Sequence, residues 1–220
     1  MTRAIIFANG RMQDPPIILS HRQPSDLIIA ADGGTHHCKS LGITPDVIIG
    51  DLDSLDPNEV TAYQQAGVEI HQYPIRKDET DLELVLQYTL KQGVSELYII
   101  GALGERWDMT VANILLMAHT MFSGLKIRML DGSQELVLLR GDDQIDLLGQ
   151  PGYQLSLIPL AGDAHGVTTH GLEYSLNDES LYFASTRGVS NVFLHDHAQV
   201  IVRKGILLCI LNRIAILPTS

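Results

Sequence analysis

Acidic side chains are concentrated at two places in the chain. One place is the end of an expected strand, and the other is the start of an expected helix. Asp51 and Asp53 directly follow a short apolar run, and Lys77 stands close to Asp78 and Asp81 ahead of a second apolar stretch. Carboxylates this close repel one another unless a cation lies among them, and oxygen ligands with open positions suit Mg²⁺ that carries phosphates. A solvated acidic turn would explain the first pair alone, whereas both groups together favour a magnesium–nucleotide site.

Two glycine-containing segments could bring bare backbone N–H groups close to phosphate oxygens. The Asp-Gly-Gly run at 32–34 ends an apolar run and opens a helix, although a tight turn explains it equally well. Residues 101–108 also lie between an apolar run and a helix, and they lack the glycine spacing and the Lys-Ser/Thr pair of a Walker loop. Arg106 could fork onto a phosphate, and Asp108 could be a helix N-cap, a metal ligand or a base.

Short apolar runs that alternate with helix-like stretches must position these residues. Strands are expected at 4–8, 26–31, 46–49, 68–73, 96–100 and 126–130. Helices are expected at 35–41, 57–66, 80–92 and 108–122. The third of these helices has Thr80 as its N-cap and Glu83 three positions on, which is a capping box. The alternation predicts a doubly wound, mostly parallel sheet with helices on both faces, and therefore the α/β class.

The pattern changes near residue 131. The later apolar runs, at 135–140, 144–148, 153–160, 180–184, 191–202 and 205–211, are short and lack a long helical period. Short strands at this spacing suggest an antiparallel sandwich or barrel. We therefore expect an α/β domain over residues 1–131 and an antiparallel β domain over residues 132–220.

Composition narrows the function and the compartment. With 15 basic and 26 acidic residues and no basic run, the chain is not expected to bind nucleic acid. Cys38 and Cys209 fit no metal or disulfide spacing, which favours a reducing cytosol. No signal peptide is recognisable and no apolar run approaches the roughly 20 residues of a spanning helix, so a soluble, cytoplasmic protein without a membrane partner is expected.

Histidines are expected to play no part in the site. His195 and His197 are alternate residues of an expected strand and share a face, but no third zinc ligand is indicated. His36 and His37 are adjacent on an expected helix and point apart, which predicts surface positions.

Together, five motifs have the order and spacing found in thiamine pyrophosphokinases, and the chain resembles that family from about residue 4 to residue 211. The motifs are Ala31-Asp32-Gly33-Gly34, Gly50-Asp51-Leu52-Asp53-Ser54, Lys77-Asp78-Glu79-Thr80-Asp81-Leu82-Glu83, Gly101-Ala102-Leu103-Gly104-Glu105-Arg106-Trp107-Asp108 and Gly188-Val189-Ser190-Asn191. The resemblance implies an N-terminal α/β catalytic domain that binds ATP and magnesium, and a C-terminal β-sandwich that helps to bind thiamine. It also implies a homodimer with active sites at the junction of the subunits, and transfer of a pyrophosphoryl group from ATP to the thiamine hydroxyl with release of AMP.

The resemblance assigns roles position by position. The Mg²⁺ ligands would be Asp51, Asp53 and Asp81, with Asp78 nearby. The residues that would bind ATP are Asp32, Gly33, Gly34, Lys77, Thr80, Gly104 and Arg106. Ser190 and Asn191 match the motif that contributes to the thiamine pocket. The chain departs from the family at Glu105, where a second glycine is usual, and at Met109, where His or Gln is usual.

The chemistry fits the residues independently of the resemblance. Attack by a hydroxyl on the β-phosphorus of ATP needs charge neutralisation more than covalent help, and Mg²⁺ with Lys77 and Arg106 would supply it. Asp81 would take part in catalysis as one of the Mg²⁺ ligands, and Asp108 would orient or deprotonate the hydroxyl.

Two other functions stay open at this point. An aspartate-nucleophile phosphatase also has a strand followed by Asp-x-Asp, but Leu55 follows Ser54 where that class has Thr or Val, and the motif is not on the first strand. A thiamine or nucleotide sensor that has lost catalysis is the other alternative, and Glu105 beside the phosphate loop is the reason to consider it.

Overall fold

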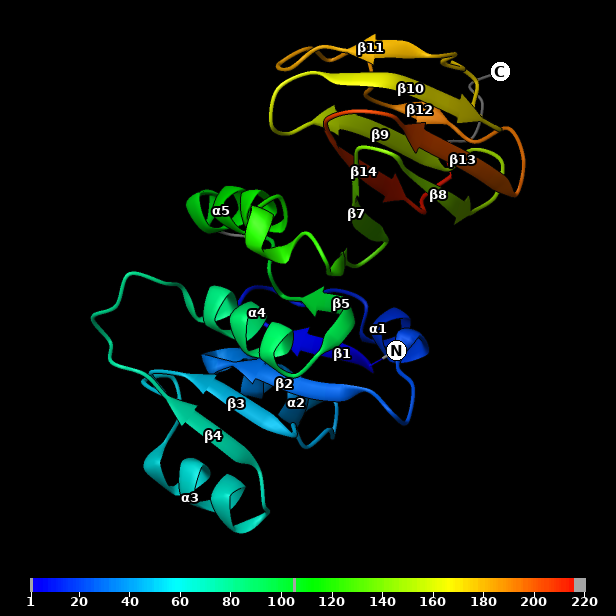
Figure 1. Cartoon of the computed structure of the whole chain (residues 1–220). Coiled ribbons are helices and arrows are strands. Elements are labelled where there is room, and N and C mark those ends of the chain that lie inside the picture. The colour runs from blue at the N-terminus through cyan, green and yellow to red at the C-terminus, as the bar shows by residue number, and fades with distance from the viewer. Residues whose placement is uncertain (1, 105, 216–220) are drawn as a thin grey trace. The chain divides into compact units, whose positions relative to one another are not determined.

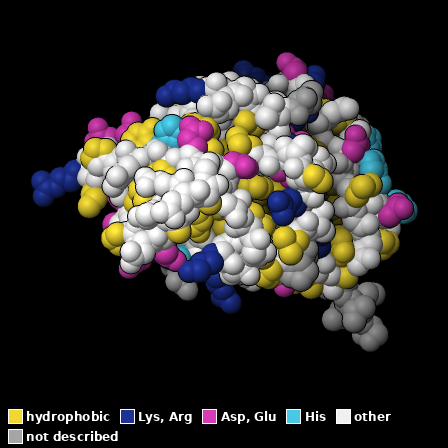
Figure 2. All heavy atoms as spheres, turned by 90° about the horizontal axis from the view of Figure 1, so that it is seen from below, with side chains coloured by type: hydrophobic (Ala, Val, Ile, Leu, Met, Phe, Trp, Pro, Cys, Tyr) yellow, Lys and Arg dark blue, Asp and Glu magenta, His cyan; other side chains and the backbone are white. Residues whose placement is uncertain are grey.

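The computed structural model describes residues 2–104 and 106–215, and the chain divides into two compact units, Met1–Gly132 and Ser133–Ser220 (Figure 1). Within the described residues, no helix is both long and apolar enough to cross a membrane. On the face of the molecule drawn in Figure 2, Lys and Arg side chains lie apart from one another among acidic and hydrophobic ones.

The first unit is built on six parallel strands in the spatial order β6-β5-β1-β2-β3-β4. They are β1 Thr2–Phe7, β2 Leu27–Ala31, β3 Val47–Gly50, β4 Glu69–Gln72, β5 Val94–Ile100 and β6 Lys126–Asp131. All six strands were expected, and their bounds differ from the expected ones by two residues at most. Strands β1, β2, β3 and β5 are buried almost throughout because helices cover both faces of the sheet.

Helices connect these strands and determine where ligands can bind. They are α1 Pro15–His21, α2 Thr35–Ser40, α3 Pro57–Gln65, α4 Asp81–Lys91 and α5 Trp107–Met117. The strand order changes direction after β4, so right-handed crossovers place α4 on the opposite face from α2, as Figure 1 shows. The change leaves a switch point between the neighbours β1 and β5, which is where open α/β sheets bind ligands, at the carboxyl ends of the strands.

The structure corrects three of the expectations about the helices. The box of Asp56 and Glu59 is complete at α3, whereas at α4 the Thr80 hydroxyl accepts a bond from the Glu83 N–H without a described return bond. The helix expected at 108–122 ends at Met117, and a separate 3₁₀ turn follows at Thr120–Phe122. Helix α1 was not predicted, because its seven residues are too few for a clear apolar period.

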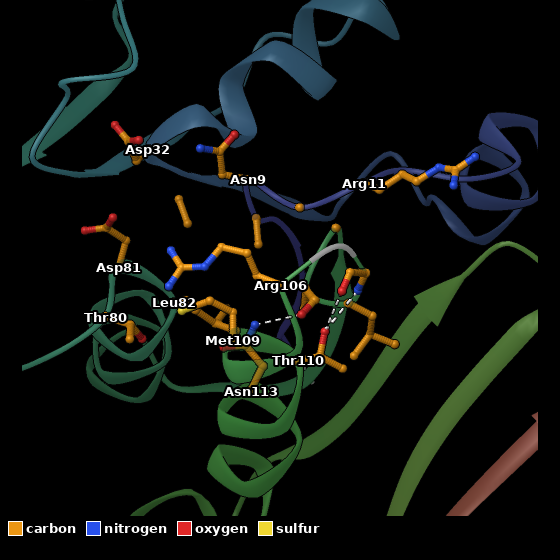
Figure 3. A pocket seen from close by; sticks show the side chains of 17 residues that line it. Asn9, Arg11, Asp32, Thr80, Asp81, Leu82, Arg106, Met109, Thr110 and Asn113 are labelled. Carbon is orange, nitrogen blue, oxygen red and sulfur yellow. Dashed lines mark hydrogen bonds between the residues drawn. The ribbon is translucent and has the colours of Figure 1, made fainter.

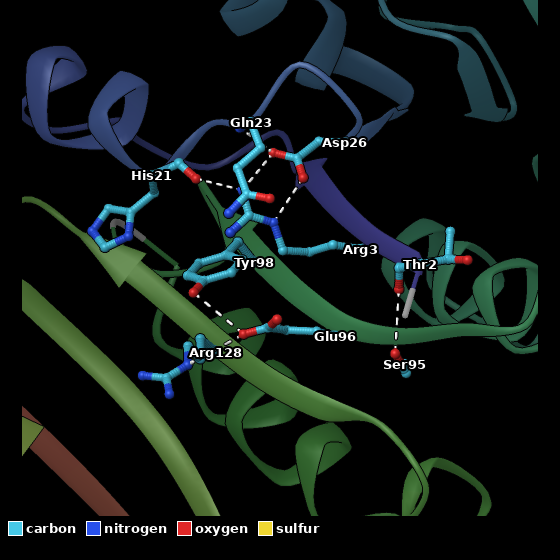
Figure 4. A network of polar contacts seen from close by, with 9 residues as sticks. All are labelled: Thr2, Arg3, His21, Gln23, Asp26, Ser95, Glu96, Tyr98 and Arg128. Carbon is cyan, nitrogen blue, oxygen red and sulfur yellow. Dashed lines mark hydrogen bonds and ion pairs between the residues drawn. The ribbon is translucent and has the colours of Figure 1, made fainter. Parts of the chain in front are cut away.

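An ion-pair network holds the end of α1 at the amino ends of the strands, which is the edge of the sheet opposite the carboxyl ends (Figure 4). The Arg3 guanidinium donates two hydrogen bonds of 2.7 Å to the carboxylate of Asp26 and one of 2.6 Å to the carbonyl of His21. It also lies 5.0 Å from the ring centroid of Tyr98. The network joins β1, β5, the end of α1 and the turn before β2.

The second unit consists of two antiparallel sheets, in the orders β12-β9-β14-β7 and β11-β10-β13-β8, that share one hydrophobic core. The strands are β7 Gln134–Arg140, β8 Asp143–Leu148, β9 Gln154–Pro159, β10 Ala164–His170, β11 Glu179–Leu181, β12 Asn191–Val192, β13 His197–Val202 and β14 Ile206–Asn212. The expected β-sandwich is thus confirmed, but the run 191–202 is split into two strands and β10 was missed. Turns set by glycine and polar residues override the apolar pattern at these places.

Candidate active site

Three carboxylates meet where β2 and β3 end. Asp32 begins the 3₁₀ turn Asp32–Gly34 after β2, and Asp51 and Asp53 follow β3, so neighbouring parallel strands deliver all three to one edge. One carboxylate oxygen from each residue lies within 4.8 Å of the others. Gly50 makes this approach possible, because a Cβ at that position would lie 2.8 Å from the Cβ of Asp32. We call Asp32, Asp51 and Asp53 the acidic triad.

Asp32 is the buried member of the acidic triad, with 5% of its surface exposed. Its Oδ1 is buried and has no hydrogen-bond partner among the described residues. Its backbone is left-handed, with φ 45°, a conformation that aspartate tolerates better than most residues. An unpartnered buried carboxylate oxygen is costly, and a bound cation would satisfy it. The donor set, three carboxylates with different degrees of solvent access, suits a hard divalent cation.

Lys77 links the acidic triad to the start of α4. Its Nζ lies 3.6 Å from Oδ2 of Asp51 and 2.9 Å from Oδ1 of Asp81, and only 12% of its side chain is exposed. Burial lowers the pKa of Lys77, but the two carboxylates outweigh this effect and the pKa is raised. Burial raises the pKa of Asp81, and Lys77 offsets that rise only in part. Both acids therefore depend on one ammonium group for their charge balance.

The predicted metal ligands are thus brought together in part. Asp51 and Asp53 belong to the acidic triad, and Asp81 shares Lys77 with Asp51. Asp78 is exposed and takes part in no hydrogen bond or ion pair within the described part of the chain. Asp32 completes the acidic triad, and its expected contact with nucleotide stays a prediction.

A cavity of about 540 Å³ lies at the switch point of the first unit (Figure 3). Loops after β1, β2 and β5 line it, together with the first turns of α4 and α5. Five of the predicted site residues are in its lining, namely Asp32, Thr80, Asp81, Gly104 and Arg106. Sequence reasoning missed Asn9, Arg11, Thr110 and Asn113, which also line it. The Asn-Gly pair that closes the first apolar run was the available signal, since it stands at the same edge of the sheet.

Gly33 and Gly34 serve close packing. A Cβ on Gly33 would lie 2.3 Å from Oδ1 of Asn9, and a Cβ on Gly34 would lie 1.9 Å from the carbonyl oxygen of Phe7. These two glycines let the start of α2 press against the end of β1, and neither lines the cavity. Their expected contact with phosphate stays a prediction.

Arg106 and Asp108 form an ion pair at the start of α5. Nη2 of Arg106 lies 2.5 Å from Oδ2 of Asp108, its Nε lies 3.2 Å from Oδ1, and both side chains are exposed. The hydrogen bonds from Arg106 lower the pKa of Asp108. The N-cap of α5 is Arg106, so the prediction of Asp108 as N-cap is wrong, because the helix begins one residue earlier than expected. Glu105 lies outside the described residues.

His37 is half-buried, and its side chain contacts the loop after β1. Its Nε2 lies 2.6 Å from the carbonyl oxygen of Gly10, and Gly10 in turn donates its N–H to the carbonyl of Gly101 at 2.7 Å. The imidazole therefore supports the loop after β1 from the side of α2. The prediction that His36 and His37 point apart agrees with the exposure of His36.

The second unit contains the predicted thiamine residues. Asn191 is buried, and its side chain accepts a bond from the backbone N–H of Tyr174 at 3.0 Å and donates one to the Tyr174 carbonyl at 2.7 Å. Ser190 is exposed, and its N–H donates to Oγ of Ser156 at 3.0 Å. In the part of the chain that the structure describes, His195 and His197 belong to no group of three metal-ligating residues.

Comparisons with known proteins favour one of the three functions considered for this chain. A family model described as thiamin pyrophosphokinase, catalytic domain, matches residues 20–129, and one described as its vitamin B1 binding domain matches residues 144–207. A thiamine pyrophosphokinase of Bacillus subtilis is 31% identical over 206 residues, which are 93% of this chain and 96% of that protein. The chain belongs to the thiamine pyrophosphokinase family. The predicted resemblance is thereby confirmed over nearly the whole length.

Further sequence and structure comparisons agree with this assignment. A thiamine pyrophosphokinase of Oryza sativa is 30% identical over 157 residues, covering 67% of this chain and 59% of that protein. The crystal structure of thiamine pyrophosphokinase from Bacillus subtilis has a TM-score of 0.84 at 27% identity and covers 97% of this chain and 100% of that one. The yeast enzyme, at 18% identity and a TM-score of 0.77, shares the fold and covers 97% of this chain and 86% of that one.

Proposed function

We propose that the chain transfers a pyrophosphoryl group from ATP to the hydroxyl of thiamine, giving thiamine diphosphate and AMP. The observation that carries the proposal is the acidic triad, with its unpartnered Asp32 oxygen, beside Lys77 and a cavity of about 540 Å³. The acidic triad and Lys77 lie within residues 20–129, which match the catalytic family model. The second unit, which contains the match to the vitamin B1 binding domain, would bind thiamine.

Asp32, Asp51 and Asp53 would hold Mg²⁺, with Asp81 close enough to share Lys77 with Asp51. The set differs from the sequence-based one by the addition of Asp32 and by the exposure of Asp78. When bound, Mg²⁺ would neutralise negative charge on the triphosphate and polarise its oxygens. The protein's own part is to present crowded carboxylates that favour a cation, and to hold them with Lys77.

Lys77 and Arg106 would bind phosphates from two sides. Lys77 is fixed by two carboxylates, so it offers a positioned point charge. Arg106 is paired with Asp108, but both side chains are exposed and solvent screens their attraction, so a polyphosphate would compete for Arg106 effectively. Figure 3 shows the Arg106 guanidinium turned toward the side of the pocket where Asp81 lies.

Asp108 would accept the hydrogen bond of the thiamine hydroxyl and orient that oxygen for attack on the β-phosphorus. While Arg106 donates to Asp108, the lowered pKa makes the carboxylate a weak base. Movement of Arg106 to a phosphate removes that cause, so the carboxylate becomes the stronger base only when ATP is in place. Binding of the nucleotide would thereby prepare the acceptor side of the site.

We also propose a homodimer in the cytoplasm. Helix α5 presents Trp107, Val111 and Leu115 along one stripe with 78%, 52% and 50% of their surfaces exposed, and such a stripe beside Asp108 suits a second subunit. Free, buried Cys38 and Cys209 agree with a reducing compartment. Light scattering on the purified protein should give twice the chain mass of 24.2 kDa, and a monomer at assay concentrations would contradict the dimer.

The activity is tested by counting AMP released from ATP with and without thiamine. The proposal requires AMP and thiamine diphosphate in equal amounts, formed only when thiamine and Mg²⁺ are both present. Inorganic phosphate released without thiamine would favour the phosphatase, and binding of ATP without turnover would favour the sensor.

The role of Asp108 is tested by Asp108→Asn. Turnover should fall at least about 100-fold, the usual size of a general acid–base contribution, while ATP still binds. Asp142→Asn, an exposed turn residue of the second unit with φ 64°, is the matched control and should keep normal turnover. Normal turnover in Asp108→Asn would remove the assigned role.

A further inference from the structure

Thr110 holds the backbone on both sides of residue 105. Its hydroxyl accepts a hydrogen bond from the N–H of Gly104 at 3.1 Å and donates one to the carbonyl of the same residue at 3.1 Å. Its own backbone N–H donates to the carbonyl of Arg106 at 2.9 Å. One residue of α5 therefore fixes both neighbours of the position between Gly104 and Arg106.

The loop has little else to hold it there. A Cβ on Gly104 would meet only Arg11, at 3.5 Å from its Cβ, and the N-cap Arg106 makes no side-chain capping bond. Within the described residues, Thr110 is the one side chain that hydrogen-bonds Gly104. Gly104 has φ 122°, a conformation that few other residues adopt, and it has no side chain. Without the hydrogen bonds to Thr110, side-chain packing at Gly104 would therefore not hold the loop in place.

A second bond from the same helix extends this attachment. Asn113, one turn further along α5, is buried and donates from Nδ2 to the carbonyl of Ala102 at 2.7 Å. Figure 3 draws the hydrogen bonds of Thr110 and Asn113 as dashed lines near Arg106. The loop after β5 is thus held against α5 at two points, and the point at Thr110 is the one next to Arg106.

We infer that Thr110 is a positioning residue that sets the direction of the Arg106 guanidinium toward the phosphates of ATP. This inference rests on the proposed function, which gives Arg106 its phosphate. The physical reason is geometric: an arginine binds phosphate well only when its planar fork is presented correctly, and its backbone at a helix start is otherwise free to shift.

Thr110→Val tests the inference, because valine has the same shape but lacks the hydroxyl. The KM for ATP should rise about fivefold to tenfold, the range expected when two modest hydrogen bonds are lost, while the KM for thiamine stays unchanged. Thr110→Ser, which restores the hydroxyl, should return the KM for ATP to within twofold of normal. Thr61→Val is the matched control, since the Thr61 hydroxyl also bonds a backbone carbonyl, that of Pro57, but on α3.

A double-mutant cycle with Arg106→Gln decides whether Thr110 acts through Arg106. If it does, Thr110→Val should add less than twofold to the KM for ATP once Arg106 has been replaced. Equal effects of Thr110→Val in both backgrounds, or a fall in Tm with normal KM values, would overturn the inference while the AMP assay still supports the activity. Absence of AMP from the unmodified protein would instead reject the proposed function itself.

Discussion

Asp32→Asn should make the protein more stable without metal and less able to bind it. Asp32 is the buried carboxylate of the acidic triad, and its Oδ1 has no hydrogen-bond partner among the described residues. The amide keeps the shape of the side chain, removes its charge and adds a donor that faces two carboxylates. Stability and metal affinity therefore move in opposite directions, which a merely structural residue would not produce.

The size of the effect follows from the geometry. Carboxylate oxygens of the acidic triad lie within 4.8 Å of one another, and at an effective dielectric constant of about 20 two unit charges at that distance repel by about 3.5 kcal/mol. Solvent reaches Asp53 and Lys77 offsets part of the charge of Asp51, so the net gain on removing one charge is smaller. We expect Asp32→Asn to raise the free energy of unfolding in EDTA by about 1–2 kcal/mol.

Urea unfolding followed by circular dichroism, in EDTA and in Mg²⁺, measures both quantities. At a Mg²⁺ concentration ten times the dissociation constant, the unmodified protein should gain about 1.4 kcal/mol, and Asp32→Asn should gain almost nothing. Glu79→Gln, which removes a carboxylate from outside the acidic triad, is the control and should behave like the unmodified protein in both solutions. Destabilisation of Asp32→Asn in EDTA, or an undiminished gain from Mg²⁺, would refute the reasoning.

Two further predictions concern the other ion pairs. Lys77→Met leaves the half-buried carboxylate of Asp81 without its cation, so the free energy of unfolding in urea should fall by about 3 kcal/mol, and adding Asp81→Asn should restore most stability but no activity. Burial raises the pKa of Asp26, but its bonds from the Arg3 guanidinium and a backbone N–H outweigh burial and lower it. A lowered pKa in the folded state supplies stability above the unfolded value of 3.8 that is lost as the pH falls through the folded value. Asp26→Asn should therefore cost about 3 kcal/mol at pH 7, and urea midpoints of variant and parent should converge as the pH falls below that range.

The parallel sheet and the family could be predicted from the sequence because both depend on local signals. Buried parallel strands read as short apolar runs, and each run in the first unit ends at polar residues or glycine. The second unit was harder, since the run 191–202 has the composition of one strand yet bends at residues 194–196 and passes from one sheet to the other. A turn of this kind is fixed by tertiary pairing of β13 with β8 and β10, which no local pattern reveals.

The site shows the same division between local and tertiary information. Motif spacing singled out Asp51, Asp53 and Lys77 as candidates, but not the place of Asp32 in the acidic triad, which depends on the pairing of β2 with β3. The hydrogen bonds of Thr110 could not be predicted either, because they depend on the loop conformation at Gly104 and not on the sequence neighbours of Thr110.

At this edge of the sheet, glycines allow the strand ends to approach closely, and this approach brings carboxylates together. A Cβ on Gly10 would lie 2.3 Å from the carbonyl oxygen of Gly101, and a Cβ on Gly50 would collide with Asp32, so side chains at these positions would force the strand ends apart. Close approach concentrates negative charge, which disfavours the folded state until a cation arrives. The buried strands of the first unit must supply the stability that offsets this repulsion. Separating the strand ends would relieve the repulsion and also disperse the carboxylate oxygens, so the crowding that weakens the ligand-free protein is the same feature that would give the proposed site its affinity for a cation.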